Sequence, residues 1–171
     1  DKSYTGKVTP VKVQAESSNG IKVDTTYTPE IVPVTPTATP AETTDIQGKT
    51  QEGTPTFTQG DETAPITITP EQPAKFVVNG QPVDSTEIPA TKDGKQIGTY
   101  TIDPTTGVIT FQPNKDFTGT PDPAKVVAKD TNGTKVETTY TPTVTPVTPT
   151  AEPKETTGKQ GQPQTQETES M

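Results

Sequence analysis

Four aspartates near predicted turns are the side chains best suited by type to chemistry in this sequence. Together they could hold a calcium ion, which takes six to eight oxygen ligands, and a pair of them could act as general acid and base. The four are Asp103, Asp116, Asp122 and Asp130, with Asp103 and Asp116 as the carboxylate pair. No stretch has acidic residues at EF-hand spacing, and carboxylates are common solvated turn formers. We therefore interpret all four as turn residues and predict no catalytic or metal site.

Acid–base and thiol chemistry lack their usual side chains. The chain has no histidine and no cysteine, so the commonest general base and the commonest thiol nucleophile are both missing. Without cysteine there are also no disulfides and no zinc site built on thiolates. We therefore expect a protein that is not an enzyme and that carries no cofactor.

A Lys–Asn isopeptide bond beside a buried carboxylate would be a substitute for the missing disulfides. Asn114, Lys115 and Asp116 supply the three residue types, although adjacency in sequence does not place them in a buried triad. A mass deficit of about 17 Da, the loss of ammonia, would reveal the bond.

Two short motifs have both a functional and a structural interpretation. Asn132-Gly133-Thr134 matches an N-glycosylation acceptor, but Asn-Gly also favours a hairpin turn, and the equivalent Asn19-Gly20-Ile21 does not match the acceptor. Pro33/Pro36 and Pro146/Pro149 have the PxxP spacing of SH3 ligands, which usually carry an arginine that this chain lacks. We interpret these motifs as a turn and a spacer; O-glycosylation of spacer threonines stays open.

Composition limits the partners of the chain. Its 171 residues include 20 prolines and are only 25% hydrophobic, with a formal charge of −8 and no arginine. An acidic chain lacks the basic patch that neutralises phosphates, so we expect no binding to nucleic acid or to anionic membranes. No window of 18 apolar residues predicts membrane insertion, and the first residues are not a signal peptide.

Alternating apolar and polar residues predict strands almost throughout. Val11 to Tyr27 and Val126 to Tyr140 each alternate on both sides of an Asn-Gly pair. Both residues of such a pair tolerate the positive φ angles of a tight turn. We predict a β-hairpin in each segment.

Residues from about 54 to 144 give roughly seven short strands, with turns at spacings of about 8–12 residues. The clearest pair is QIGTYTIDPTTGVITFQP, in which Asp103 to Gly107 form the bend. The pattern predicts an all-β fold, an immunoglobulin-like β-sandwich with Pro/Thr-rich extended linkers. Its predicted core residues are Ile66, Ile68, Phe76, Val78, Ile88, Tyr100, Ile102, Ile109, Phe111, Phe117, Val126, Ala128, Val136 and Tyr140.

Prolines recur every three or four residues after each hairpin, which is typical of a polyproline II spacer. The predicted organisation is a C-terminal hairpin of a preceding incomplete repeat in 1–29, a linker in 30–53, a complete sandwich in 54–146, and a linker with a disordered tail in 147–171. An isolated hairpin is marginal in water. We therefore expect the first hairpin to fray or to pair with a sheet edge of another molecule.

The chain repeats itself. The stretch from Lys2 to about Gln51 returns from Lys115 to about Gln164, so each residue has its counterpart 113 positions later. This period is far longer than a solenoid unit and fits one domain with its connector. The sequence is therefore typical of about one and a half repeats from a longer array.

Three blocks carry a family resemblance: YTPEIVPVTPTATPAETTDIQGKTQEGTPTFTQGD, GTYTIDPTTGVITFQPNKDFTGTPDPA and NGTKVETTYTPTVTPVTPTAEPKETTGKQGQPQT. In this order they resemble the CshA-type fibril repeats of streptococcal surface adhesins, up to about Gln164. The resemblance implies a tandem array that forms a fibril on the cell wall of a Gram-positive bacterium. In that family the array holds out a non-repetitive adhesive region, and a C-terminal sorting signal ties it to peptidoglycan.

The expected function is a structural stalk repeat that projects an adhesive tip from the extracellular surface. Its expected partners are neighbouring repeats of the same chain, with host matrix glycoproteins contacted through other regions of the parent protein. The alternative is a binding module, in which the repeat itself contacts host matrix glycoproteins or identical repeats on neighbouring cells.

Overall fold

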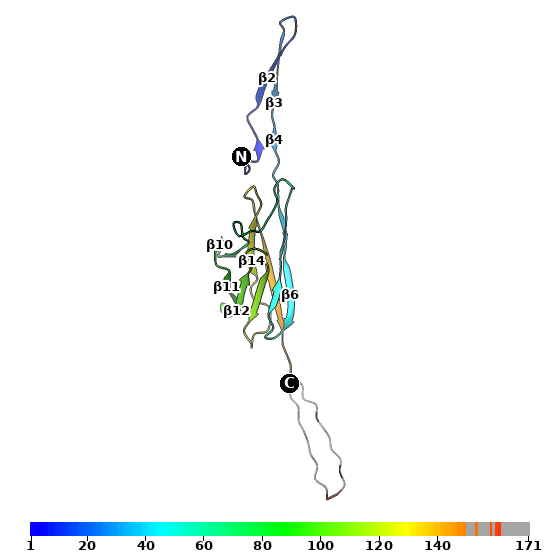
Figure 1. The fold of residues 1–171 in the computed structure, drawn as a ribbon, viewed down its shortest axis with the longest axis vertical. Helices are drawn as coiled ribbons and strands as arrows, with labels where there is room; N and C mark the ends of the chain where they lie inside the picture. Colours follow the sequence, from blue (N-terminus) through cyan, green and yellow to red (C-terminus); the bar gives the residue numbers. More distant parts are fainter. Residues whose placement is uncertain (150–152, 154–157, 159, 162–171) are drawn as a thin grey trace.

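The computed structural model describes residues 1–149, 153, 158, 160 and 161 of the chain. Within these residues the structure consists of strands and turns without a helix, so none of them forms a helix that could cross a membrane. The molecule is elongated (Figure 1): an N-terminal hairpin projects from one end, a β-sandwich forms the middle, and the chain leaves at the opposite end. The predicted all-β class is confirmed.

Two sheets pack face to face to form the sandwich. The larger, in order, is β10 (Gln81–Pro82), β9 (Lys75–Val78), β14 (Ala124–Lys129), β15 (Lys135–Thr145) and β6 (Ala41–Ile46). The smaller is β11 (Glu87–Lys92), β12 (Lys95–Ile102), β13 (Ile109–Pro113) and β7 (Gln51–Gly53). The predicted β-sandwich is confirmed, and its described residues form sheets of five and four strands where about seven strands were expected.

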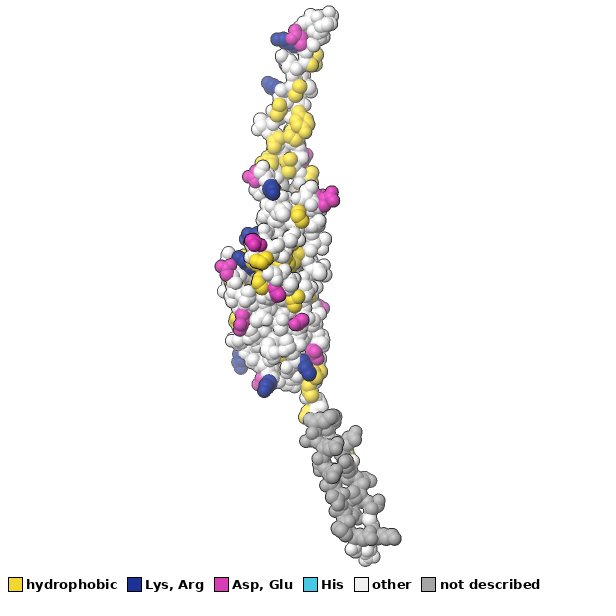
Figure 2. All heavy atoms as spheres, in the orientation of Figure 1, with side chains coloured by type: hydrophobic (Ala, Val, Ile, Leu, Met, Phe, Trp, Pro, Cys, Tyr) yellow, Lys and Arg dark blue, Asp and Glu magenta, His cyan; other side chains and the backbone are white. Residues whose placement is uncertain are grey.

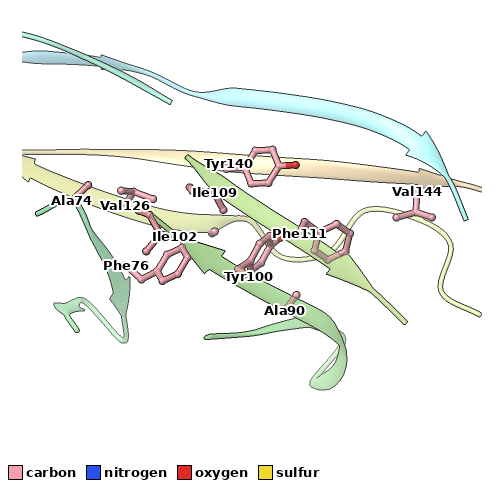
Figure 3. Close-up of a cluster of buried hydrophobic side chains, with 11 residues drawn as sticks. Ala74, Phe76, Ala90, Tyr100, Ile102, Ile109, Phe111, Val126, Tyr140 and Val144 are labelled. Atoms are coloured by element: carbon pink, nitrogen blue, oxygen red, sulfur yellow. The ribbon is translucent and has the colours of Figure 1, made fainter. Parts of the chain in front are cut away.

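The core lies between the sheets, where alternate residues of each strand point inward. Figure 3 shows the rings of Tyr100, Phe111 and Tyr140 at its centre. Most predicted core residues are buried: Phe76, Tyr100, Ile102, Ile109, Phe111, Val126, Ala128 and Tyr140. Five more are partly buried: Ile66, Ile68, Ile88, Phe117 and Val136. The prediction missed Ala74, Ala90, Ala124 and Val144.

The prediction of a core position is wrong for one residue, Val78. Val78 is 37% exposed because it ends β9 beside the turn at Asn79 and Gly80. Both turn residues have positive φ angles, 53° and 78°, as a two-residue hairpin turn of the Asn-Gly kind requires. The turn was expected, but the strand leaves the core one residue earlier than the alternation suggested.

The structure corrects the linker expected over residues 30–53. Within it lie β4 (Glu30–Ile31), β5 (Thr37–Thr39), β6 and β7, and β5 pairs with β8 (Thr56–Thr58). β6 extends the larger sheet and β7 the smaller, so this segment closes one side of the sandwich. The proline spacing suggested polyproline II. In addition, β6 has the sequence AETTDI, whose near absence of apolar alternation gave no sign of a strand. Its pairing partner is distant in sequence, and a local pattern does not reveal it.

The predicted N-terminal hairpin is formed by β2 (Val11–Glu16) and β3 (Lys22–Tyr27), and β1 (Gly6–Lys7) pairs with β4 at its base. Every residue of β2 and β3 is exposed. The hairpin lies beyond the end of the sandwich (Figure 1) and makes no pairing with its sheets.

Candidate functional site

The four aspartates considered for chemistry lie on separate loops. Asp103 is in the turn between β12 and β13, Asp116 follows β13, Asp122 precedes β14, and Asp130 is in the turn between β14 and β15. The Asp103 carboxylate accepts hydrogen bonds from the hydroxyl of Thr105 at 2.8 Å and from its N–H at 2.9 Å. These bonds lower the pKa of Asp103, so the group stays ionised as a turn former and is not poised as an acid.

No cluster of three or more His, Cys, Asp or Glu side chains suited to a metal occurs in the described part of the chain. Asp130 is nevertheless unusual, because it is only 1% exposed. Its Oδ1 accepts the N–H groups of Asn132 and Thr134, both at 2.9 Å. Its Oδ2 is buried and has no hydrogen-bond partner among the described residues. Asp130 thus closes the hairpin turn as a side-chain cap.

The residues considered for an isopeptide bond are not in a buried triad. Asn114, Lys115 and Asp116 are all exposed in the loop after β13. The Asn114 amide instead donates to the main-chain oxygen of Gln96 at 3.5 Å. Their arrangement is that of a surface turn.

The two short motifs have structural places. Asn132-Gly133-Thr134 forms the β14–β15 turn, in which the Gly133 N–H donates to the main-chain oxygen of Asp130 at 3.0 Å. Of the PxxP prolines, Pro36 is buried while Pro33, Pro146 and Pro149 are exposed. The N-terminal pair therefore includes a residue that a groove-binding partner could not reach.

The most distinctive feature of the sandwich is the pairing of β6 with β15, which we call the parallel clamp. The two strands run in the same direction, from Tyr140 beside Ala41 to Thr145 beside Ile46. The chain reaches β6 from the end where the N-terminal hairpin lies and leaves from the far end of β15 (Figure 1). A pull on the two ends of the repeat would therefore draw β6 and β15 in opposite directions. Ladder hydrogen bonds run across strands, so this pull would load the clamp in shear.

A side-chain network crosses the clamp. The Tyr140 hydroxyl and Thr43 Oγ1 are 2.6 Å apart, and Thr43 donates to Gln51 Oε1 at 2.7 Å. Because a threonine hydroxyl has a single hydrogen, Tyr140 must be the donor to Thr43. Gln51, only 4% exposed, donates from Nε2 to the Thr143 main-chain oxygen at 3.0 Å. The network therefore joins β15, β6 and β7.

The Tyr140 ring fills a slot that exists because residue 53 is glycine. A Cβ added at Gly53 would lie within 2.6 Å of two ring carbons of Tyr140, which is closer than real contacts allow. On its other side the Tyr140 ring makes an edge contact with the Tyr100 ring, and the two ring centroids are 6.2 Å apart. The ring centroids of Tyr100 and Phe111 are in turn 5.3 Å apart. Such tilted aromatic contacts add to the free energy of burial.

Burial raises the pKa of both core tyrosines. For Tyr100 the neighbouring Tyr140 and Asp122 add to the effect, and its hydroxyl donates to the Asp122 main-chain oxygen at 2.8 Å. For Tyr140 the bond to Thr43 opposes the effect of burial. Both hydroxyls are therefore neutral donors that hold strands together.

Pro142 lies within the clamp without breaking it. Its backbone nitrogen points to the same side of β15 as that of Val144, two residues later. The Val144 N–H donates to the main-chain oxygen of Gly119 at 2.8 Å, on the side away from β6. A proline at position 142 therefore removes no hydrogen bond to β6. This explains how an 11-residue strand continues through a proline.

Sequence reasoning missed Thr43, Gln51 and Gly53 because all three lie in the expected linker. The one available signal was Gly53, since a glycine within a strand often marks a close approach by another group. The contribution of Tyr140 to the core was predicted.

Comparison with known proteins gives the family. No curated protein matches the chain. A family model described as the surface adhesin CshA repetitive domain matches residues 33–144, which is more than half of the chain. The matched range begins within the expected linker and ends in β15, so it includes both strands of the parallel clamp. The chain therefore belongs to the family of the surface adhesin CshA repetitive domain, a repeat of cell-surface adhesins.

Proposed function

We propose that the chain is a structural tandem repeat that forms the stalk of a cell-surface fibril and projects an adhesive tip in bacterial adhesion. The observation that carries this proposal is the parallel clamp between β6 and β15. It lies between the two ends of the repeat, where tension along a fibril would act. The location that fits this role is the cell wall of a Gram-positive bacterium, with neighbouring repeats of the same chain as partners.

The shape and the surface support the same role. The chain enters and leaves the sandwich at opposite ends (Figure 1), so successive repeats would add to the length of a fibre. Figure 2 shows acidic and basic side chains scattered over the sandwich without a large patch of one sign on the visible face. With a formal charge of −8, neighbouring fibres would repel one another.

Scattering in solution tests the stalk. Tandem polypeptides with one, two and three copies of residues 33–145 would be measured by small-angle X-ray scattering. The proposal expects the maximum dimension to increase linearly with the number of repeats. A slower increase, as in a collapsed cluster, would refute it.

One observation favours the alternative of a binding module for host matrix glycoproteins or for identical repeats. Tyr4 and Tyr27 are 43% and 63% exposed, and exposed aromatic residues often anchor interfaces. Saturable binding of a two-repeat polypeptide to host matrix glycoproteins would establish this alternative. Binding of the full chain that disappears when residues 1–32 are removed would assign it to the N-terminal hairpin.

A further inference from the structure

The sequence that joins one repeat to the next occurs twice in the described part of the chain. Residues 32–36 (VPVTP) lead from the N-terminal hairpin into the sandwich, and residues 145–149 (TPVTP) leave the sandwich 113 positions later. The pairing just before it is the same in both places, because β1 pairs with β4 at the first and Gly119 lies opposite Val144 at the second. The first place shows how the following repeat holds this joint, and the second shows how the preceding repeat holds it.

The following repeat holds the joint from Thr35 onward. A Cβ added at Gly60 would lie 2.5 Å from the main-chain oxygen of Thr35 and 2.8 Å from its nitrogen. The backbone of Thr35 is therefore in direct contact with the loop after β8, and glycine permits this approach because it has no Cβ. Pro36 is buried, and β5 begins at the next residue. The sandwich thus fixes the chain where it enters.

The preceding repeat holds the joint as far as Val147. β15 pairs with β6 up to Thr145, whose main-chain oxygen accepts the Gln47 N–H at 2.9 Å. The Val147 N–H donates to the Gln47 side-chain oxygen at 3.3 Å. Gln47 lies in the turn between β6 and β7, so this turn binds the chain on both sides of Pro146.

These two sets of contacts meet without a gap. Val147 is the counterpart of Val34, and Val34 directly precedes Thr35. The residue bound by Gln47 of one repeat is therefore adjacent to the residue held by Gly60 of the next, and adjacent Cα atoms are about 3.8 Å apart. The position before them is a proline in both copies, Pro33 and Pro146, which fixes φ near about −65° and restricts the residue that precedes it.

The joint at residues 32–36 has the arrangement that these contacts require. Tyr4 and Ile31, at the base of the N-terminal hairpin, line one hollow together with Asn132 and Thr134 of the sandwich. The two units thus face each other directly across the joint. Figure 1 shows the hairpin and the sandwich following one another along the long axis of the molecule.

We propose that consecutive repeats meet head to tail at a stiff joint without a free linker. The β6–β7 turn of one repeat lies beside the loop after β8 of the next, and Gln47 and Gly60 hold adjacent residues of the chain that connects them. This inference rests on the proposed tandem stalk and adds what aligns its repeats. Because the β6–β7 turn also ends the parallel clamp, tension passes from the clamp of one repeat directly to the next.

The test uses the full chain with residues 33–145 duplicated in place, which reproduces the joint sequence TPVTP between the two copies. The chain has no cysteine, so Lys125→Cys in both copies gives two exposed sites for spin labels. Double electron–electron resonance measures the distribution of distances between them. A stiff joint gives a distribution about as narrow as that between Glu52→Cys and Lys125→Cys within one copy.

Three changes at the joint should widen this distribution. Gly-Ser-Gly inserted between positions 34 and 35 of the second copy creates a flexible linker and should widen it at least about twofold. Gln47→Ala in the first copy and Gly60→Ala in the second should each widen it, whereas Gln81→Ala, at an exposed glutamine on β10, should not. An unchanged distance for the label pair within one copy shows that each variant is still folded.

Two results would overturn the proposal. One is a distribution for the unaltered joint as broad as that of the insertion variant. The other is an unchanged width in both Gln47→Ala and Gly60→Ala. X-ray scattering of the tandem polypeptides separates this inference from the stalk itself: a broad distribution with linear growth of the maximum dimension overturns the joint alone, whereas a narrow distribution with slower growth overturns the stalk and leaves the joint.

Discussion

The hydroxyl of Tyr140 on β15 lies 2.6 Å from Oγ1 of Thr43 on β6, and 97 positions separate the two residues in sequence. This bond joins β6 and β15, which are the earliest and the latest strands of the larger sheet in chain order. Together with the bond from Thr43 to Gln51, it ties the parallel clamp to the smaller sheet. The stability of the repeat and its resistance to tension therefore depend on the same few groups.

Removing this bond lowers stability. Tyr140→Phe should reduce the free energy of unfolding by about 1 kcal/mol, the usual net contribution of one hydrogen bond. Thr43→Val should cost about 1–3 kcal/mol, because it leaves both the Tyr140 hydroxyl and Gln51 Oε1 without their partner. Urea denaturation of residues 1–149 measures both values. Thr44→Val, at an exposed position of the same strand, is the control and should change stability by less than about 0.5 kcal/mol. Losses no larger than the control would remove the network from the account.

The slot at Gly53 should not accept a side chain. Gly53→Ala places a Cβ against the Tyr140 ring, and relief requires the ring or the backbone to move. Overpacking of this kind costs about 1–3 kcal/mol. Thermal unfolding would measure the loss, with Glu52→Ala as the exposed control. Unchanged stability in Gly53→Ala would mean that the ring does not occupy this slot.

Stability should decrease in alkali. Burial raises the pKa of Tyr100 and Tyr140 in the folded state above the ordinary value of about 10. As the pH rises, the unfolded chain then loses the tyrosine protons before the folded chain does. The contribution of the two neutral tyrosines to the free energy of unfolding is therefore complete below about pH 10 and is lost as the pH rises above it. Urea denaturation between pH 8 and 11.5 measures this dependence. Tyr100→Phe should flatten it, whereas Tyr27→Phe, at an exposed tyrosine, should not. Equal dependence in both variants would contradict the assignment to buried tyrosines.

The Asp130 cap should be replaceable by serine but not by alanine. Asp130→Ala removes an acceptor for two N–H groups and should cost about 1–3 kcal/mol. The counterpart in the N-terminal hairpin is Ser17, whose hydroxyl accepts the Ile21 N–H at 3.2 Å. Asp130→Ser should therefore cost less, as denaturant unfolding would show. Equal losses in the two variants would mean that the cap bonds do not stabilise the turn.

Local signals predicted those parts of the fold that local sequence determines. The Asn132-Gly133 turn and the bend from Asp103 to Gly107 followed from turn chemistry. The inward positions of Tyr100 and Phe111 followed from alternation. In each case the strands that pair are adjacent in sequence.

The rest depended on contacts between distant residues. β6 is an edge strand whose inward positions include Ala41 and Thr43, so it shows no apolar alternation. Its parallel partner is β15, about 100 residues later, and Pro142 argued against a strand at that point. The clamp and the network around Thr43 therefore could not be predicted from the sequence, although Tyr140 could be assigned to the core.

The orientation of the pull is the feature on which the stalk account depends. Because the chain has no cysteine, pairs of introduced cysteines give unambiguous attachment points for single-molecule force spectroscopy. Val32→Cys with Thr148→Cys pulls the clamp in shear, since β6 and β15 are drawn in opposite directions. Lys49→Cys with Thr148→Cys pulls both strands from the same end and peels them apart pair by pair.

Force spectroscopy on these two attachment pairs tests the load-bearing role most directly. The account predicts a clearly higher unfolding force for attachment at positions 32 and 148 than for attachment at positions 49 and 148. Tyr140→Phe should lower the first force more than the second. An unfolding force at positions 32 and 148 equal to or below that at positions 49 and 148 would contradict the account.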